Sequence, residues 1–308
     1  MYYYTLNSEN DVLVEEERLD VLPSAESLEI EITMPNGGER VETADEVPLQ
    51  YDEAAVEESA QLMSSVVASG TCGTNLTWTL DQAGLLTISG SGAMDGYFTT
   101  DAPWHSYKGQ IRQLVIQNGV TQLGETAFGD CTNMVSATIP EGITKLPLQF
   151  FCNCASLTNI TFPSSLKRLD NESLWNIGDR DFVVPASVTE VEGHFYGGMS
   201  GEPYRIHVDQ ENPSFTTVNG VMFSKDLKTL VQFPCDDRVE YTVPAGTKII
   251  REHAFMYNVT LQTVTFPASV KAIQPWSFQS LSSLKTIYYI GTREQWDKIV
   301  NKSIMTRC

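Results

Sequence analysis

Hydrophobic and polar positions alternate in short runs along most of this chain. Leu76, Trp78 and Leu80 alternate with polar residues, and Leu86 and Ile88 resume the alternation after a short Gly-containing stretch. Alternation with a period of two places one face of a strand against a core, and two such runs joined by a tight turn predict a β-hairpin. We therefore expect a hairpin module at the start of the folded body.

The body that follows repeats itself with a regular 23-residue step. Phe128 and Phe151 are separated by this step, as are Cys131 and Cys154. The same step returns in a second block, in the pairs Pro244 and Pro267, Phe255 and Phe278, and Leu261 and Leu284. A repeat of about 20–29 residues predicts a leucine-rich-repeat solenoid, in which each coil buries its apolar face against the next coil. Phe128 and Phe151 should therefore lie one above the other, and Phe255 should lie above Phe278.

Each coil is predicted to contribute one short strand. In the coil that begins at Asn159, Ile160 and Phe162 should point inward and Thr161 outward, and Pro163 should end the strand because it has no N–H to donate. Strands of this kind are expected to end near residues 116, 139, 162, 184, 208, 243, 266 and 289.

The spacing is interrupted after the fifth strand. The apolar runs 220–223 and 229–233 flank the polar stretch 224–228. Two apolar runs around a short polar turn predict a hairpin. We expect this hairpin to emerge from the solenoid as an insertion at about residues 212–236.

The charge of the chain is concentrated at its N-terminus. Residues 1–71 hold 17 acidic residues against Arg18 and Arg40, whereas the rest of the chain is nearly neutral. High charge with few periodic apolar positions favours a disordered or partly ordered arm, although Leu28, Ile30 and Ile32 alternate as in a strand. No basic run is present, which argues against nucleic-acid binding.

Several segments resemble BspA-like leucine-rich-repeat proteins. The segments 120–128 and 248–255 resemble the family's Val-Thr-x-Ile-Gly-x-x-Ala-Phe signature, and 162–166 and 266–270 resemble its Ile-Pro-x-Ser-Val segment. Many bacterial members start with a module that is similar to Gly70-Thr71-Cys72-Gly73, Pro103-Trp104 and 116–120 of this chain. Their closing segment resembles residues 288–296. The resemblance covers about residues 70–300 and excludes the acidic arm.

The resemblance implies a right-handed solenoid of a secreted or surface-attached bacterial protein, used for adhesion or host-protein binding. It implies no catalytic residues and no cofactor. The expected function is therefore a non-enzymatic binding module that recognises an extracellular protein or glycan. The alternative is a structural spacer of a larger surface protein whose catalytic or anchoring domain is absent, since no leader or wall-attachment signal is visible in the chain.

The expected domain organisation follows from these observations. It comprises an acidic arm (1–71), an N-terminal hairpin cap (72–110), a solenoid (111–300) and a C-terminal tail (301–308). No run of about 20 apolar residues is present, so we expect no membrane insertion. We expect a monomer.

The cysteines and histidines do not predict a catalytic or metal site. Cys152 and Cys154 form one close pair, but a structural zinc site needs four ligands and no second pair exists. Cys131 and Cys154 occupy the same repeat position, and either a disulfide between adjacent coils or two buried thiols is compatible with their spacing. The histidines 105, 194, 207 and 253 share no ligand spacing, and we expect His253 to face solvent in a turn.

The outward strand positions are the remaining candidate for binding. Thr138, Thr161, Thr265 and Tyr288 are predicted to line one exposed sheet. Threonine suits any solvated strand, but a flat uncharged face also suits a protein or glycan ligand. Aromatic residues near the two ends either anchor such a ligand or close the ends of the core: Trp78, Trp104, Tyr107, Tyr288, Tyr289 and Trp296. For Trp78 and Trp296 we favour closure of the core.

Overall fold

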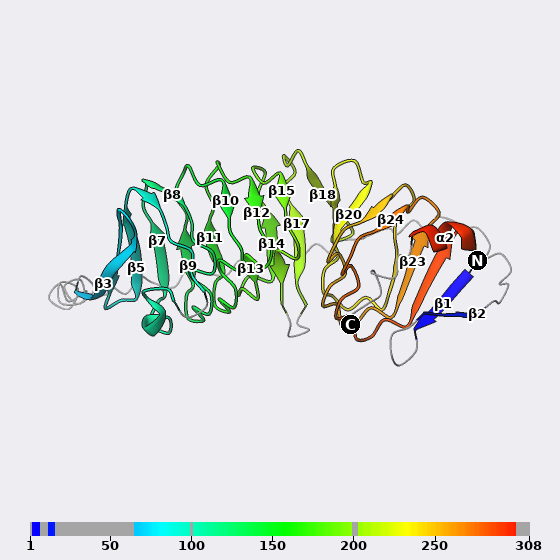
Figure 1. Ribbon diagram of the computed structural model, residues 1–308, viewed down its shortest axis with the longest axis horizontal. Coiled ribbons are helices and arrows are strands. Elements are labelled where there is room, and N and C mark those ends of the chain that lie inside the picture. Colours follow the sequence, from blue (N-terminus) through cyan, green and yellow to red (C-terminus); the bar gives the residue numbers. More distant parts are fainter. Residues whose placement is uncertain (1, 7–11, 16–64, 99–100, 199–202, 300–308) are drawn as a thin grey trace, which may run out of the picture.

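Eight short strands follow one another along one side of an elongated solenoid (Figure 1). The computed structural model describes residues 2–6, 12–15, 65–98, 101–198 and 203–299. The strands are β7 (Gln113–Ile116), β9 (Ser136–Thr138), β11 (Asn159–Thr161), β14 (Asp181–Val184), β17 (Arg205–Val208), β21 (Glu240–Thr242), β23 (Thr263–Pro267) and β25 (Thr286–Ile290). They end where the 23-residue pattern places them, so the predicted solenoid is confirmed.

The N-terminal end of the solenoid is closed by an antiparallel hairpin module. Its strands are β3 (Val66–Gly73), β4 (Leu76–Asp81) and β5 (Leu85–Gly90), and β5 pairs in parallel with β7. The predicted hairpin corresponds to β4 and β5. The preceding strand β3 begins at Val66, before the boundary expected at residue 72. A short 3-10 helix, η1 (His105–Tyr107), and the bridge between β6 (Gly92–Ala93) and β8 (Val120–Gln122) complete the module.

The strand side of the solenoid is divided into three sheets, which differs from the single sheet expected. β3, β4, β5, β7, β9 and β11 form one sheet, β14 and β17 form a second, and β21, β23 and β25 belong to a third. The first break coincides with a coil of different length, because β14 starts one position earlier than the 23-residue repeat places it after β11. Coil length alone does not cause the break, since β17 starts one position later than the repeat places it after β14 and the two strands still pair. The insertion after β17 causes the second break.

The opposite side of the coils carries shorter bridges. They are β10 (Lys145–Leu146), β12 (Arg168–Leu169), β15 (Glu190–Val191), β13 (Leu174–Trp175), β16 (Tyr196–Gly197), β22 (Ile249–Ile250) and β24 (Ala272–Ile273). β10, β12 and β15 form one parallel ladder, and β22 and β24 continue in a second ladder that also contains the insertion.

The insertion lies between the two halves of the solenoid and does not emerge from it, so that part of the prediction is wrong. It is a three-stranded antiparallel meander of β18 (Phe215–Val218), β19 (Val221–Ser224) and β20 (Thr229–Gln232). Met222 and Val231 belong to the N-terminal hydrophobic core, whereas Phe223 and Leu230 belong to the C-terminal core. Continuous apolar runs such as 221–223 are typical of strands buried on both faces.

The core consists of aromatic side chains stacked from coil to coil. The ring centroids of Phe128 and Phe151 lie 6.2 Å apart, and those of Phe255 and Phe278 lie 5.6 Å apart with nearly parallel planes. This confirms the stacking expected from the 23-residue step. Trp104 extends the first stack, with its ring 4.9 Å from that of Phe128. Each fully buried ring of this size contributes roughly 1.5–3 kcal/mol through burial.

Helix α2 and the strand pair β1–β2 cover the C-terminal end of the array (Figure 1). Helix α2 (Arg293–Ile299) places the buried Trp296 against Phe266 and Tyr289. β1 (Tyr2–Leu6) pairs antiparallel with the outer edge of β25, and β2 (Val12–Glu15) pairs with β1. The first two strands of the chain therefore lie at the end of the solenoid opposite to β3.

Three features predicted from the sequence lie outside the described residues. They are the greater part of the acidic arm, at 16–64, the alternating positions Leu28, Ile30 and Ile32 within it, and the tail 301–308. Within the described residues, no helix combines the length and hydropathy needed to cross a bilayer.

Candidate binding surface

The four predicted site residues form two separate cross-strand pairs. Thr138 and Thr161 are direct neighbours on β9 and β11, and both are exposed. Thr265 and Tyr288 are direct neighbours on β23 and β25, and both are half-buried. The structure thus brings the members of each pair together, but it places the two pairs in different sheets.

The pair on β9 and β11 belongs to a row of outward side chains that crosses the whole six-stranded sheet. We call it the hydroxyl row, and its members in register are Ser69, Thr79, Thr87, Val115, Thr138 and Thr161. Adjacent members are separated by the strand spacing of about 4.8 Å. Five of the six side chains carry a hydroxyl group, and none is charged.

The positions beside the hydroxyl row are mostly polar and almost free of charge, with Leu85 on β5 as an apolar exception. The outward neighbours are Thr71, Thr77 and Ser89 at one end of the strands, and Gln113, Ser136 and Asn159 at the other. Asp81 is the charged residue on the outward face of β4, and its Oδ1 accepts a hydrogen bond from the backbone N–H of Leu85 at 2.8 Å. The sheet therefore presents a flat face of hydroxyl and amide groups.

A charged strand pair separates the two halves of the predicted site. On β14 and β17 the outward side chains include Asp181, Arg205 and His207. The Nε2 atom of His207 lies 2.6 Å from Oδ1 of Asp181. The hydroxyl row therefore ends at Thr161, and a ligand of the N-terminal face would meet a different chemistry beyond it.

A groove of about 410 Å³ lies where the insertion meets the N-terminal half of the solenoid. It is lined by charged residues of the short ladders, including Arg168, Glu190, Glu192 and Arg251. Arg168 pairs with both glutamates and with Asp170. Because Arg168 already engages these carboxylates, the groove offers no unpaired acid–base couple of the kind that general catalysis requires.

Arg251 closes the open edge of the N-terminal ladder beside this groove. β15 is the last strand of the described ladder β10–β12–β15. The Nη2 atom of Arg251 donates a hydrogen bond of 2.5 Å to the carbonyl oxygen of Val191 on this strand. The Nη1 atom is buried and has no hydrogen-bond partner among the described residues. Burial lowers the pKa of the Arg251 guanidinium.

The structure brings together two histidines that lie far apart in the sequence. The Nδ1 atom of His194 lies 3.4 Å from the carbonyl oxygen of His253, and the hydroxyl of Tyr204 lies 3.4 Å from Nε2 of His194. Complete burial lowers the pKa of His194 to about 3, so the ring is neutral at physiological pH. His253 is half-buried against Trp276 and does not simply face solvent as expected.

The described cysteines are free thiols. Cys131 and Cys154 are both buried inside the coils, and the thiol of Cys154 donates a hydrogen bond of 3.1 Å to the carbonyl oxygen of Phe128. Burial raises the pKa of Cys131 to about 12 and that of Cys154 well above its usual value. Such thiols are poor nucleophiles and poor metal ligands. Across the described part of the chain, no three His, Cys, Asp or Glu residues are grouped so as to hold a metal ion.

The turns at one corner of the coils carry two columns of residues in the left-handed conformation. The first column contains Thr126, Gln149, Glu172, His253 and Trp276, and the second contains Asp130, Asn153, Asn176, Tyr257 and Ser280. In the N-terminal half, the second column is an amide ladder in which Asn176 donates to Asn153, and Asn153 donates to Asp130. In the C-terminal half, the first column is aromatic. The sequence pattern gave no signal for these columns, because many residue types occupy them.

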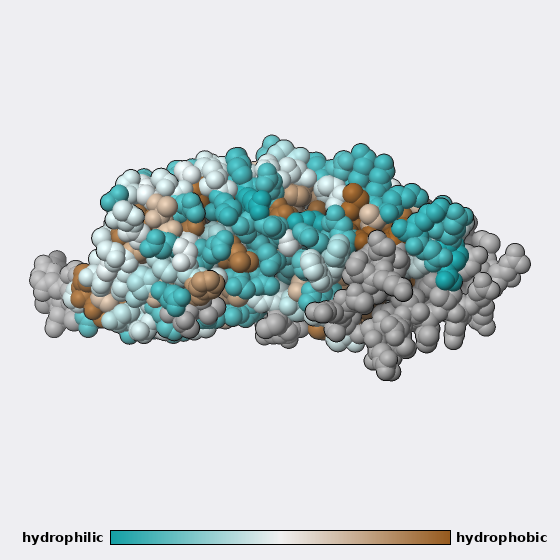
Figure 2. All heavy atoms as spheres, in the orientation of Figure 1, coloured by the Kyte–Doolittle hydropathy of each residue, from teal (hydrophilic) through white to brown (hydrophobic). Residues whose placement is uncertain are grey.

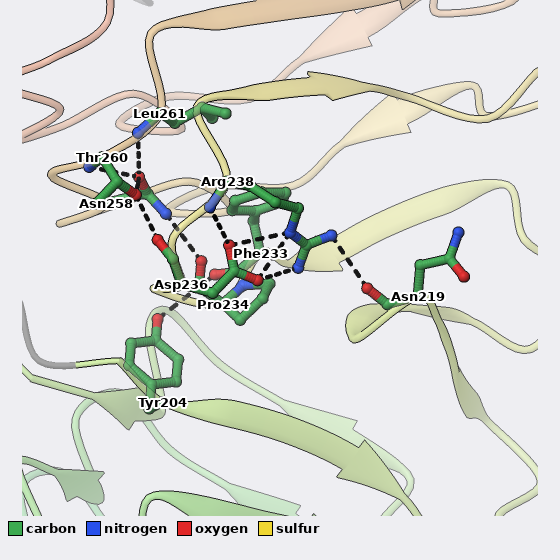
Figure 3. Close-up of polar contacts among 9 residues, drawn as sticks. All are labelled: Tyr204, Asn219, Phe233, Pro234, Asp236, Arg238, Asn258, Thr260 and Leu261. Carbon is green, nitrogen blue, oxygen red and sulfur yellow. Dashed lines mark hydrogen bonds and ion pairs between the residues drawn. The ribbon is translucent and has the colours of Figure 1, made fainter.

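A polar cluster fastens the insertion to the C-terminal half (Figure 3). The guanidinium of Arg238 binds both carboxylate oxygens of Asp236, donates to the carbonyl of Asn219 at 3.0 Å, and lies 4.8 Å from the centre of the Phe233 ring. Asn219 lies in the turn between β18 and β19. Arg238 therefore ties the tip of this hairpin to the loop by which the chain re-enters the solenoid.

The surface in the view of Figure 2 carries no large hydrophobic patch among the described residues. Hydrophobic residues are scattered there among hydrophilic and intermediate ones. Four of the aromatic residues expected at the ends serve the core, since Trp104 and Tyr289 are fully buried and Trp78 and Trp296 are nearly so, whereas Tyr107 and Tyr288 are half-buried. The face in the view of Figure 2 is therefore mostly polar, with scattered exposed hydrophobic side chains.

Comparison of the sequence with protein families gives one match. The family described as "BspA type Leucine rich repeat region" matches in six copies, over residues 105–207 and 233–302. None of the curated proteins matches the chain.

Comparison with solved structures finds bacterial leucine-rich-repeat proteins. A leucine-rich repeat protein from Eubacterium ventriosum is 22% identical, with a TM-score of 0.54, and the match covers 72% of each chain. The pneumococcal vaccine antigen PcpA is 16% identical with a TM-score of 0.49, covering 73% of this chain and 70% of that one. A leucine rich cell surface protein from Faecalibacterium prausnitzii is 16% identical with a TM-score of 0.38, covering 77% and 98%. The first of these matches supports the solenoid fold.

Proposed function

Because the chain belongs to the BspA-type leucine-rich-repeat family, we propose that it is a non-enzymatic binding module of a bacterial secreted or cell-surface protein. In this proposal, the outer face of the six-stranded sheet recognises an extracellular protein or glycan. The observation that carries the proposal is the hydroxyl row, which crosses six strands in register without a charged member.

The chemistry of this face supports recognition of a neutral polar ligand. A hydroxyl group both donates and accepts hydrogen bonds, so a row of them can pair with peptide groups or with sugar hydroxyls. Uncharged groups are also cheaper to remove from water than ions are. Strands hold the side chains on a rigid scaffold, which lowers the entropy lost on binding.

Three features of the described residues favour a role without catalysis. The carboxylates of the groove are engaged with Arg168, the thiols of Cys131 and Cys154 are buried, and the ring of His194 is enclosed in the core. Catalysis by such groups requires a nucleophile and a base within reach of a substrate.

Affinity capture with a matched pair of variants tests the proposal. The immobilised protein is exposed to mucus, serum and extracellular-matrix extracts, and each captured component is purified and titrated against it. The double variant Thr138→Lys with Thr161→Lys places two charges side by side in the hydroxyl row and should abolish saturable binding. The control Thr265→Lys changes the C-terminal sheet and should leave binding intact. Binding that survives the double variant would contradict the assignment of this face.

A structural spacer is the second candidate, and the elongated shape favours it. The hairpin module and helix α2 lie at opposite ends of the solenoid (Figure 1), so the array can hold attached domains apart. A spacer predicts that the folded protein captures nothing saturably from these three sources. It also predicts that the double lysine variant behaves like the unaltered chain.

A further inference from the structure

Trp276 differs from the other four tryptophans of the chain in its exposure. It is 48% exposed, whereas the others are at most 4% exposed: Trp78, Trp104, Trp175 and Trp296. A tryptophan that closes the core contributes through complete burial, as Trp296 does at the same end of the solenoid. Closure of the core therefore does not account for Trp276.

The indole of Trp276 is stacked on one side and ends a column of side chains. Its ring lies 5.4 Å from that of His253 in the preceding coil, and the two planes are inclined by only 14°. Within the described residues no further coil follows, because the chain continues from β25 into α2. Within the described residues, the column of turn residues therefore ends at Trp276, on the side of the indole that faces away from His253.

The backbone does not favour tryptophan at this position either. Trp276 has a φ of 57°, in the left-handed region that bulky side chains rarely adopt. The corresponding positions of other coils hold polar residues with similar φ angles, such as Thr126, Gln149 and Glu172. Trp276 is thus exposed although it is a large aromatic residue, and its backbone adopts a conformation that such residues rarely take. A tryptophan kept at such a position indicates a role at the surface.

The turn that holds the exposed indole contains no charged residue. Gln274 is exposed, Gln279 and Ser280 are half-buried, and Ser277 is fully buried. Burial lowers the pKa of His253, so the ring beneath the indole is neutral at physiological pH. The turn thus presents an aromatic plane in a segment whose accessible neighbours, Gln274, Gln279 and Ser280, carry amide and hydroxyl groups.

We propose that Trp276 is a stacking platform for one pyranose ring of a neutral glycan. The C–H groups on one face of a pyranose carry a small positive charge and fit the negative face of an aromatic ring. The sugar hydroxyls need neutral donors and acceptors at the edge of the platform, which glutamine and serine provide. This inference goes beyond the proposed function, because it adds a second binding site, on the turn side of the coils and separate from the hydroxyl row.

Other ligand classes fit this turn less well. A tryptophan that anchors a protein partner usually lies in a well-packed pocket with a surrounding contact ring, whereas the residues beside Trp276 are small or polar. An organic cation prefers several aromatic faces around it. The carboxylate of Glu252, in the preceding turn, lies 3.7 Å from the guanidinium of Arg251 and is thereby partly neutralised.

Intrinsic fluorescence tests the inference, because Trp276 is the tryptophan that water reaches. The full chain is titrated with tetrasaccharides of β-linked glucose, β-linked N-acetylglucosamine, α-linked mannose and β-linked galactose. Binding of at least one of them should shift the tryptophan emission to shorter wavelength. Trp276→Ala should abolish the shift and weaken binding, measured by calorimetry, about tenfold or more, because one aromatic contact accounts for about that factor. Trp276→Tyr should retain most of the affinity.

Two controls separate this inference from the proposed function. The Thr138→Lys and Thr161→Lys double variant should bind the tetrasaccharide as the unaltered chain does, and circular dichroism should show that every variant is folded. Binding that Trp276→Ala retains, or the absence of any emission shift with all four tetrasaccharides, would overturn the platform. Either result leaves the hydroxyl row to be judged by its own capture experiment.

Discussion

At the residue scale, one repeat position is occupied by different chemical types. The third position after the phenylalanine of a coil is held by Cys131, Cys154, Asn258 and Leu281. The thiol of Cys154 makes one hydrogen bond to a carbonyl group. The amide of Asn258 satisfies more groups: it donates to the carbonyl of Pro234 and accepts from the N–H groups of Thr260 and Leu261 (Figure 3). The polar residues at this position therefore pair with the backbone, whereas Leu281 fills it with an apolar side chain.

This comparison gives a prediction for Asn258. Asn258→Leu should lower the free energy of unfolding by roughly 2–4 kcal/mol, because it leaves a buried carbonyl and buried N–H groups without partners. Asn258→Cys should cost less, since other coils use cysteine there. Urea denaturation measures both changes. Asn159→Ala, on an exposed strand position, is the control and should change stability by less than about 0.5 kcal/mol. Equal stability of the leucine variant would contradict the role assigned to the amide.

The sequence predicts residue contacts where the period applies and misses them elsewhere. Phe128 and Phe151 stack because the coils that hold them have equal length. The contact of Trp104 with Phe128 lies before the first regular coil, and no period predicts it. The stack of His253 on Trp276 depends on left-handed turn positions, and their residue types vary too much from coil to coil to give a signal.

At the scale of elements, the strands could be predicted from the sequence but not their division into sheets. A strand needs only a short apolar alternation and a proline or turn after it, and these are local. Strand pairing does not follow from the step alone, because β14 pairs with β17 although the step between them is one residue longer than the repeat, whereas β11 and β14 do not pair. The two cross-strand neighbour pairs could therefore be predicted from the period, while the predicted continuous row is interrupted. The binding role of these residues stays a prediction.

The tip of the β18–β19 hairpin is fastened by Arg238, which leads to a second prediction. Arg238→Lys should lower the free energy of unfolding by about 1–3 kcal/mol, because an ammonium group cannot bind Asp236 through two atoms and reach the carbonyl of Asn219 at once. Hydrogen exchange should accelerate in the β18–β19 hairpin. Arg205→Lys, on the outward face of β17, is the matched control. Unchanged exchange in the hairpin of the Arg238 variant would refute this fastening role.

The edge of β25 gives a third prediction. An uncovered strand edge pairs readily with another chain, and β1 covers this edge through backbone pairing from Tyr2 to Thr5. Deletion of residues 1–15 should therefore produce concentration-dependent self-association, whereas the full chain should stay monomeric in analytical ultracentrifugation. Adding Tyr288→Lys to the deletion should restore the monomer, because a charge on an edge strand opposes pairing. A deletion that remains monomeric at high concentration would show that β1 does not protect the edge.

At the scale of the whole molecule, the solenoid contains two hydrophobic cores joined at the insertion. Residues of β19 and β20 contribute to both cores, with Met222 on the N-terminal side and Phe223 on the C-terminal side. His194 lies at the same junction and contacts the backbone of the coil that contains His253. The stability of the array as a whole therefore depends on a buried imidazole that sequence reasoning could not place, because its partners Tyr204 and His253 lie in other coils.

This junction predicts a dependence of stability on pH. The unfolded His194 has an ordinary pKa of 6.5, and burial lowers it to about 3 in the folded protein. Below about pH 6.5 only the unfolded chain takes up the proton, so this contribution to stability is complete above that pH and declines as the pH falls toward 3. Between pH 7 and pH 4 the loss is about 3 kcal/mol, from about 1.36 kcal/mol per unit.

Removing the imidazole isolates this contribution. His194→Phe keeps a buried ring without a titrating group, so the free energy of unfolding should fall by about 3 kcal/mol less between pH 7 and pH 4 than in the unaltered chain. His253→Gln should have a smaller effect of the same sign, because burial lowers the pKa of that half-buried ring as well. Urea denaturation at both pH values gives the comparison. If the phenylalanine variant lost as much stability as the unaltered chain, another group would have to control the acid sensitivity of the junction.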